Sequence, residues 1–254
     1  MPTIVKTVSE WRSLRAESRS AGRSVGFVPT MGALHAGHES LFKAAKRECD
    51  IVLASVFVNP TQFDERRDFE LYPRSLEEDC KRMDAAGVDF VFAPEEAQMY
   101  PDGKRYTVNE RPFSGELCGA HRPGHFTGVL TVVMKLLQIA GADRAYFGEK
   151  DFQQLELIRG MCEAFFIPTL IVPCPTVREP DGLAMSSRNS RLTPEERARA
   201  PLFHKALVQA PTATGARAEL EAAGFRVDYV EDRRGRRFGA VRLGATRLID
   251  NVAR

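Results

Sequence analysis

Apolar residues in the first two thirds of the chain follow two patterns, short continuous runs and helical spacing. Residues 51–58 are almost wholly apolar, which is typical of a strand buried on both faces of a parallel sheet. Stretches with apolar residues three or four positions apart lie between such runs and predict helices. We expect strands at 25–28, 51–58, 89–93, 144–147 and 169–172, and helices at 7–21, 75–86, 127–139, 152–163 and from residue 41 onward.

This alternation of strands and helices predicts an α/β fold with a Rossmann-like, doubly wound parallel sheet. Ligands of such sheets bind at the carboxyl ends of the strands. Pro29 should end the first strand, because proline cannot donate to a sheet ladder. Ser75 and Glu78 should form a capping box that opens a helix, and Gly87 should stop that helix.

A second, smaller part of the chain is expected after Pro173 and Pro175. Its expected parts are a polar loop at 178–189, a helix opened by a Thr193–Glu196 capping box, a loose connector at 210–216, and strands at 227–230, 238–243 and 246–252. We therefore predict two domains. Residues 1–176 would carry the parallel sheet, and residues 177–254 would form a smaller α+β domain.

Composition argues against several classes of function. The 254 residues are 43% hydrophobic and 28% charged, and 36 basic against 34 acidic residues leave a net charge of +2. Nothing in this balance favours nucleic acid or a membrane surface as a partner. No apolar run reaches transmembrane length, and the N-terminus lacks the pattern of a signal peptide. Five cysteines without a Cys-x-x-Cys pair suit buried thiols in a reducing cytoplasm.

The segment from Met31 to His38 is the strongest candidate for phosphate chemistry. Gly32 and Gly37 let the backbone approach a ligand without a Cβ in the way. A helix that starts here directs its free N–H groups and its positive dipole end into the loop. His35 and His38 would lie on one face of the first turn. These features predict a cradle for a polyphosphate, with His38 able to donate a proton or hydrogen bond.

Other polar residues follow expected strands. Lys150 comes just after one strand, where a point charge can reach phosphates. Asn59 and Gln62 follow the buried apolar run, and Gln154 comes shortly after Lys150. Amides offer both donors and acceptors, so these three side chains suit a small polyhydroxy acid as substrate.

Several stretches resemble the pantothenate synthetase family, within the HIGH-motif nucleotidyltransferase superfamily. They are Pro29–His38, Asn59–Phe63, Tyr72–Arg74, Arg122–Phe126, Gly148–Leu155, Met185–Arg188 and Val241–Asn251. Met185–Arg188 resembles the KMSKS-type loop of this superfamily, with Arg188 carrying the charge. Each stretch alone is a modest signal, but their occurrence in the expected order is a strong one.

The resemblance implies an ATP-dependent ligase that condenses (R)-pantoate with β-alanine through a pantoyl adenylate and releases AMP and pyrophosphate. It also implies a requirement for Mg²⁺, a cytoplasmic homodimer and a place in pantothenate and coenzyme A biosynthesis. The implied catalytic residues are His35, His38, Lys150, Ser186, Ser187 and Arg188. The implied nucleotide-binding residues are Met31, Gly32, His35, Gly37, His38, Gly148, Lys150, Asp151, Val177, Met185, Ser186, Ser187 and Arg188. The implied substrate-binding residues are Asn59, Gln62, Gln154 and, as a lesser candidate, Arg122. No side chain is implied as a metal ligand.

The chain departs from the family pattern in two places. The domain at 177–254, which works as a lid in this family, looks shortened between Tyr229 and Arg237 and around residues 205–220. This departure puts its closure and full activity in question. Cys118 stands where the family commonly has an acidic residue, so any contact made by that carboxylate would be lost.

Three alternatives stay open at this point. A related nucleotidyltransferase would use the same two loops, the histidine loop (Met31–His38) and the serine loop (Met185–Arg188), to transfer AMP or CMP to a phosphorylated acceptor. A metal hydrolase would bind zinc through His35, His38, His121 and His125, although Pro123-Gly124 rules out a helical His-x-x-x-His geometry. An RNA-binding protein would use the basic cluster Arg233, Arg234, Arg236 and Arg237.

Overall fold

The computed structural model describes residues 1–64 and 66–254, and six of its strands form one parallel sheet. The strand order is β1-β4-β3-β2-β5-β6. The strands are β1 (Thr3–Val5), β2 (Val25–Thr30), β3 (Ile51–Val56), β4 (Phe90–Phe92), β5 (Arg144–Gly148) and β6 (Leu170–Cys174). Because β3 and β5 lie on opposite sides of β2, the strand order reverses beside β2. Ligands bind at this switch point in open α/β sheets.

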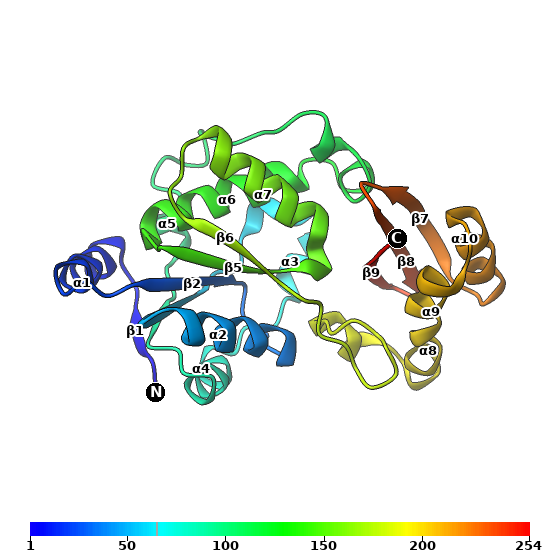
Figure 1. Ribbon diagram of the computed structural model, residues 1–254, viewed down its shortest axis with the longest axis horizontal. Coiled ribbons are helices and arrows are strands. Elements are labelled where there is room, and N and C mark those ends of the chain that lie inside the picture. Colours follow the sequence, from blue (N-terminus) through cyan, green and yellow to red (C-terminus); the bar gives the residue numbers. More distant parts are fainter. Residues whose placement is uncertain (65) are drawn as a thin grey trace. The chain divides into compact units, whose positions relative to one another are not determined.

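Helices cover both faces of this sheet, which confirms the predicted doubly wound α/β fold. Figure 1 shows α2 and α4 on one face and α6 and α7 on the other. The α-helices are α1 (Val8–Ser20), α2 (Ala36–Glu48), α3 (Arg66–Glu70), α4 (Leu76–Ala85), α5 (Glu96–Met99), α6 (His125–Ala140) and α7 (Phe152–Ala164). Short 3₁₀ turns are η1 (Pro60–Gln62), η2 (Phe113–Gly115), η3 (Gly119–His121) and η4 (Glu149–Asp151).

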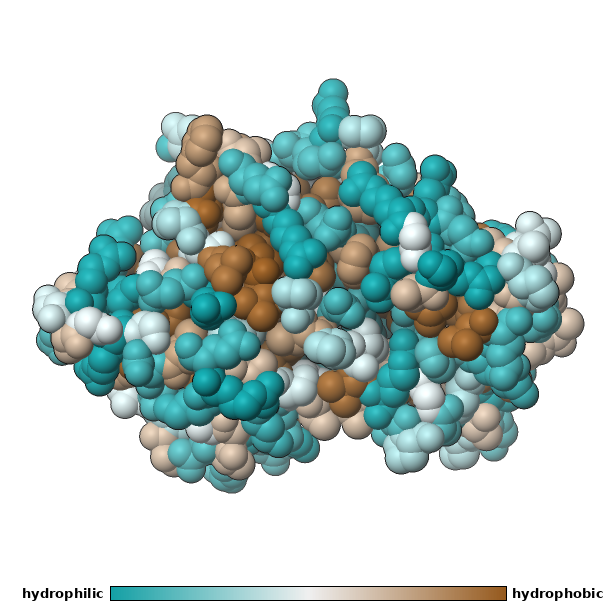
Figure 2. All heavy atoms as spheres, in the orientation of Figure 1, coloured by the Kyte–Doolittle hydropathy of each residue, from teal (hydrophilic) through white to brown (hydrophobic). Residues whose placement is uncertain are grey.

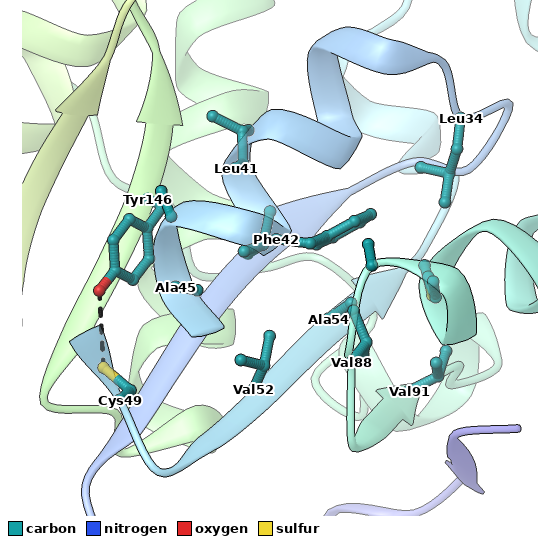
Figure 3. Packing of buried hydrophobic residues seen from close by; sticks show 14 of the residues in the cluster. Leu34, Leu41, Phe42, Ala45, Cys49, Val52, Ala54, Val88, Val91 and Tyr146 are labelled. Carbon is teal, nitrogen blue, oxygen red and sulfur yellow. Dashed lines mark hydrogen bonds between the residues drawn. The ribbon is translucent and has the colours of Figure 1, made fainter. Parts of the chain in front are cut away.

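Apolar side chains from α2, α4 and the central strands form the core on one face of the sheet. Phe42 and Ala45 of α2 pack with Val52 and Ala54 of β3 and with Val91 of β4 (Figure 3). All five are fully buried. Burial of a side chain such as Phe42 contributes roughly 1.5–3 kcal/mol. This packing holds α2 against the sheet and so fixes where its N-terminus, the predicted phosphate cradle, lies.

Two local predictions for this part of the chain are wrong. β2 continues through Pro29 to Thr30 and pairs with β3 over this length, whereas its register with β5 covers Gly26 and Phe27. Pro29 therefore lies past the pairing with β5, where its missing N–H is tolerated. α4 begins as expected, but the Ser75 side chain makes no capping hydrogen bond. Acidic residues in the first turn of α4 favour the helix dipole instead.

The chain divides into two compact units. The first comprises Met1–Gly148 and Gln153–Cys174, and the second comprises Glu149–Phe152 and Pro175–Arg254. The short segment that contains Lys150 therefore groups with the C-terminal residues. In both units the surface drawn in Figure 2 is largely hydrophilic and carries smaller apolar patches. No helix in the described part of the chain combines the length and apolar character needed to cross a membrane.

The second unit contains an antiparallel sheet in the order β7-β8-β9 and its own core. Its elements are η5 (Ser187–Arg191), α8 (Pro194–Arg199), α9 (Pro201–Gln209), α10 (Ala213–Ala222), β7 (Arg226–Arg233), β8 (Arg236–Leu243) and β9 (Thr246–Ala253). The three expected strands and the Thr193–Glu196 capping box are confirmed. The loose connector expected at 210–216 is wrong, because Thr212 caps α10 by accepting a hydrogen bond from Gly215.

Candidate active site

The backbone of the loop after β2 is fixed by hydrogen bonds to a buried carboxylate from α4. Gly32 and Ala33 have φ angles of 79° and 52°, in the left-handed region. Asp79 is 3% exposed, and its Oδ2 and Oδ1 accept hydrogen bonds from the Ala33 and Leu34 amides at 3.1 and 2.9 Å. A Cβ on residue 32 would lie 2.7 Å from Asp79 Oδ2. Glycine at this position therefore permits both the turn and the close approach of the carboxylate.

The two histidines form the N-terminal cap of α2. His35 is the N-cap residue, and its Nδ1 accepts a hydrogen bond from the Gly37 amide at 3.1 Å. His38 Nδ1 accepts from the His35 amide at 3.4 Å, and the two ring centroids are 4.2 Å apart. A neutral imidazole that accepts at Nδ1 carries its proton on Nε2. Each ring therefore has Nε2–H as its donor, at a helix N-terminus suited to phosphate.

Asn59, Gln62 and Met31 form a chain of polar contacts at the carboxyl ends of β2 and β3. Asn59 is 1% exposed, and its Nδ2 donates to Gln62 Oε1 at 3.0 Å and to the Gly128 carbonyl at 3.2 Å. Its Oδ1 accepts from the Tyr100 hydroxyl at 2.6 Å. Gln62 Nε2 in turn contacts Met31 Sδ at 3.2 Å. Both ends of the Asn59 amide are hydrogen-bonded to other protein groups. This geometry favours a role for Asn59 in orienting Gln62 over direct contact with a substrate.

Arg122 holds the loop that follows η1. Its Nε donates to Asp64 Oδ1 at 2.8 Å, and its Nη2 donates to the Gln62 carbonyl at 3.3 Å. His125 joins the same carbonyl through Nδ1 at 2.8 Å and lies 3.0 Å from Arg122 Nη1 through Nε2. Burial would raise the pKa of Asp64, but the hydrogen bond and charge of Arg122 outweigh burial and lower it. These contacts connect Arg122 to the backbone of Gln62.

Adjacent glutamines on α7 have different surroundings. Gln154, the predicted substrate ligand, is half-buried, and Gly148 ends β5 just before this region. Gln153 is buried, and it accepts from the Cys118 amide and donates to the Phe113 and Glu116 carbonyls at 2.8–3.0 Å. Gln153 thus closes the 113–118 loop. The family motif singled out Gln154, but no sequence signal indicated this structural role of Gln153.

Lys150 lies in η4 of the second unit, and its side chain is 19% exposed. Its Nζ is 3.8 Å from Asp151 Oδ2. The Asn251 side chain of β9 donates to the carbonyls of Glu149 and Lys150, both at 2.9 Å. The backbone of the lysine turn is therefore attached to the antiparallel sheet of the same unit.

The serine loop is ordered by its own backbone and side chains. Met185 N donates to the Val177 carbonyl at 3.0 Å, so these two predicted nucleotide ligands lie side by side. Ser186 caps η5, because its Oγ accepts from the Arg188 amide at 3.2 Å. The Ser187 carbonyl accepts from the Ser190 hydroxyl at 2.9 Å. The loop presents hydroxyls, amides and a guanidinium, which are the groups that bind phosphate oxygens.

Two of the alternatives lose support. The His125 ring is engaged by Arg122 and by the Gln62 carbonyl, and among the described residues no group of three or more His, Cys, Asp or Glu side chains could hold a metal ion. In the basic cluster, Arg237 is fully buried and pairs with Asp232 at 2.7 Å. The four arginines therefore do not form one exposed surface for RNA.

The structure thus groups the predicted residues into two sets. Met31, Gly32, His35, Gly37, His38, Asn59 and Gln62 surround the carboxyl ends of β2 and β3 in the first unit. Lys150, Asp151, Val177, Met185 and the 186–188 segment belong to the second unit. Asp79 and Asp250 are further candidates for positioning the site, and the sequence motifs assigned no role to either. Asp250 does fall within the C-terminal stretch that resembles the family, whereas Asp79 has no comparable signal.

A parallel α/β sheet with a histidine-bearing, glycine-containing loop at the N-terminus of the following helix is the arrangement by which α/β proteins bind nucleotide phosphates. Comparison with known proteins narrows this class. The chain belongs to the pantoate-beta-alanine ligase family, which matches residues 3–253. It is 54% identical over 252 residues to pantothenate synthetase of Bdellovibrio bacteriovorus, with 99% of each chain covered.

Two solved structures of pantothenate synthetases resemble this chain over nearly its full length. Pantothenate synthetase of Thermus thermophilus is 42% identical with a TM-score of 0.91, and 99% of each chain is covered. Pantoate-beta-alanine ligase of Francisella tularensis, complexed with beta-gamma ATP and beta-alanine, is 41% identical with a TM-score of 0.94. That comparison covers 100% of this chain and 98% of the other. The Bdellovibrio relative aligns over 252 residues that make up 99% of each chain, so these two chains are of nearly the same length.

Proposed function

We propose that this protein is an ATP-dependent ligase that joins (R)-pantoate to β-alanine and produces pantothenate, AMP and pyrophosphate. The observation that carries the proposal is family membership over residues 3–253, with relatives of this name at 54% identity. The series of contacts from Asn59 through Gln62 to Met31 supports the proposal, because these contacts place the Gln62 amide beside the histidine loop. An amide there suits a hydroxy acid better than a phosphorylated acceptor.

The reaction has two steps. A carboxylate oxygen of pantoate attacks the α-phosphorus of ATP, and pyrophosphate leaves. The neutral amine of β-alanine then attacks the carbonyl carbon of the pantoyl adenylate, AMP leaves with the electrons of the C–O bond, and the nitrogen loses one proton to solvent as the amide forms. No covalent bond to the protein is needed, so positioning and electrostatic stabilisation supply most of the rate.

We assign the roles as follows. His35 and His38 donate Nε2–H to phosphate oxygens, and the Gly32 and Gly37 backbone lets the nucleotide approach. Lys150, with Gly148 and Asp151 beside it, places an ammonium on the charge that develops on pyrophosphate. Ser186, Ser187 and Arg188, with Val177 and Met185, bind the outer phosphates. Gln62 and Gln154 bind pantoate, Asn59 orients Gln62, and Arg122 holds the Gln62 backbone.

The remaining assignments concern the assembly and its setting. We propose that residues 1–176 bind ATP and pantoate and that residues 177–254 act as a lid. Magnesium would enter with the nucleotide and offset phosphate charge, since Mg²⁺ is usually held by phosphates and a few carboxylates or waters. The five free, buried cysteines fit a reducing compartment such as the cytoplasm. We also propose that the enzyme acts as a homodimer.

The test is pantoate-dependent exchange of labelled pyrophosphate into ATP without β-alanine. We expect exchange in the parent protein and a loss of about 100-fold or more in His38→Ala and in Lys150→Ala, because each removes a donor to the transition state. Lys43→Ala, an exposed change on the same helix as His38, is the matched control. A folded protein without exchange would contradict the adenylate, and a new pyrophosphate bond in place of an amide would indicate the related nucleotidyltransferase.

A further inference from the structure

Two consecutive buried residues of β9, Asp250 and Asn251, contact segments that are far apart in the sequence. Each is 3% exposed. Successive side chains of a strand point to opposite faces. Asn251 reaches the lysine turn at 149–151, and Asp250 reaches the start of the loop that leads to Ser186. β9 contacts both η4 and η5 within the second unit.

The amide of Asn251 is oriented by a neighbouring arginine. Arg236 Nε donates to Asn251 Oδ1 at 2.7 Å, which leaves Nδ2 to donate to the Glu149 and Lys150 carbonyls at 2.9 Å. The guanidinium of Arg236 also lies 4.3 Å from the centre of the Phe152 ring, at the end of the same turn. The lysine turn is therefore attached to β8 and β9 at both its carbonyls and its adjacent aromatic side chain.

The carboxylate of Asp250 anchors the loop on the other side. It accepts from Arg178 Nη1 and Nη2 at 2.7 and 3.0 Å and lies 3.1 Å from His204 Nδ1. Arg178 also donates to the Gly182 carbonyl at 3.1 Å and forms an antiparallel bridge with Ala184. Burial would raise the pKa of Asp250, but His204 and Arg178 together lower it. Bidentate pairs of this kind fix orientation as well as adding energy.

We propose that β9 is the common mount of the Lys150 turn and the Ser186–Arg188 loop, with Asn251 and Asp250 as positioning residues for adenylate formation. The inference rests on the proposed function, which assigns both segments to the ATP phosphates. Asn251 sets the position of the Lys150 backbone, and Asp250 sets the base of the serine loop. One strand thereby fixes the spacing of groups that the chain order separates by more than thirty residues.

The first experiment is a double-mutant cycle in pyrophosphate exchange. Asn251→Ala should lower exchange about 10- to 100-fold, because a shift of about 1 Å at a catalytic group costs this much. In a Lys150→Ala background the same change should cost less than about 2-fold, since the group that it positions is already gone. Asn251→Asp, which keeps the size and the acceptor for Arg236 but removes both donors, should lose at least as much as Asn251→Ala.

The second cycle pairs Asp250→Asn with Ser187→Ala, and it should be non-additive in the same way. Val252→Ala is the control, because Val252 follows Asn251 on β9 and packs against the core of the second unit. It should lower the melting temperature while exchange stays within about 2-fold in every background. Equal losses from Asn251→Ala in the presence and absence of Lys150 would overturn the proposal.

Amide hydrogen exchange followed by mass spectrometry tests the mount without using activity. Asn251→Ala should speed exchange of peptides that contain residues 149–152, and Asp250→Asn should do so for residues 178–188, while α2 stays as protected as in the parent. Unchanged protection in both segments would overturn the mount. A parent protein with this protection pattern but no pyrophosphate exchange would contradict the proposed function and leave the mount supported.

Discussion

At the scale of single residues, Asp79 shows how a carboxylate can determine a loop that lies 45 residues earlier in the chain. Its two oxygens accept the amides of Ala33 and Leu34, and so stabilise a left-handed turn that would otherwise leave two donors unsatisfied. Burial, partly offset by these hydrogen bonds, raises the pKa of Asp79. The residue contributes to the site without being a candidate to touch a substrate.

Asp79→Ala should lower pyrophosphate exchange about 10- to 100-fold, because the histidine loop loses the contact that holds it. It should also lower the free energy of unfolding by about 1–3 kcal/mol, the cost of leaving buried donors unpaired. Glu78→Ala, at the exposed neighbouring position, should leave pyrophosphate exchange unchanged and should alter the free energy of unfolding by no more than about 0.5 kcal/mol. Full exchange activity in Asp79→Ala would contradict this role.

Asp102 provides a pH-dependent contribution to stability. A hydrogen bond from Lys135 Nζ at 2.9 Å, and a second from the Tyr106 amide, lower the pKa of Asp102 from 3.8 to about 2. Since the folded-state pKa is lowered, this stabilisation is complete above about pH 4 and is lost as the pH falls toward 2. In urea unfolding between about pH 5 and pH 2, Asp102→Asn should reduce the decline of stability below about pH 4. An unchanged decline would exclude Asp102 as its source.

At the scale of elements, the close approach of α6 to η1 determines where the amide side chains of Asn59 and Gln62 lie. A Cβ on residue 128 would overlap the Thr61 carbonyl, and Asn59 donates to the Gly128 carbonyl. Glycine lets the helix and the turn meet at backbone distance. The helix in turn buries Val129, Leu130 and Val133 in the first unit. Its position is therefore set by packing as well as by this contact.

Gly128→Ala should lower the free energy of unfolding by about 1–3 kcal/mol, because the helix and η1 must separate to admit the methyl group. It should also raise the pantoate KM, since Gln62 lies in the displaced turn. Gly160→Ala is a matched control in α7, where nothing lies within 4 Å of the added carbon. That variant should gain about 0.5–1 kcal/mol of stability in chemical denaturation and keep the parent KM. Equal behaviour of the two variants would refute the packing argument.

At the scale of the whole molecule, two separate hydrophobic cores support two sets of candidate residues. One core lies beneath the histidine loop, and the other lies between α9, α10 and the antiparallel sheet. The proposed chemistry requires both sets to act on one ATP. Nucleotide binding should therefore depend on residues of both units.

A non-hydrolysable ATP analogue at about 100 times its dissociation constant should stabilise the parent protein by about 2.7 kcal/mol and raise its melting temperature. At the same concentration, His38→Ala and Lys150→Ala should each show a smaller increase, because each loses a phosphate contact. Lys43→Ala should match the parent. An undiminished increase in either variant, measured by calorimetry, would show that the replaced side chain does not contact the nucleotide.

Much of this architecture could be predicted from local pattern. The apolar run at 51–58 predicted a buried strand and the apolar spacing at 127–139 predicted a helix, and β3 and α6 lie where they were expected. Short elements such as β1 and α5 were missed, because three or four residues carry too little periodicity to be separated from loops. The prediction that Pro29 ends its strand was wrong, because a strand can include proline where no neighbouring strand needs its missing N–H. That depends on how far each neighbouring strand extends.

What the sequence by itself determined is the α/β class and the family, and it supplied the candidate site residues, because periodicity and short motifs are local properties. Only the tertiary structure decided that Asp79 accepts the amides of Ala33 and Leu34, that Asn59 donates to Gln62, and that Asn251 of β9 donates to the Lys150 carbonyl. Those relations join residues 3 to more than 100 positions apart. Hydrogen bonds and packing in the folded chain create them, and no spacing along the sequence encodes such contacts.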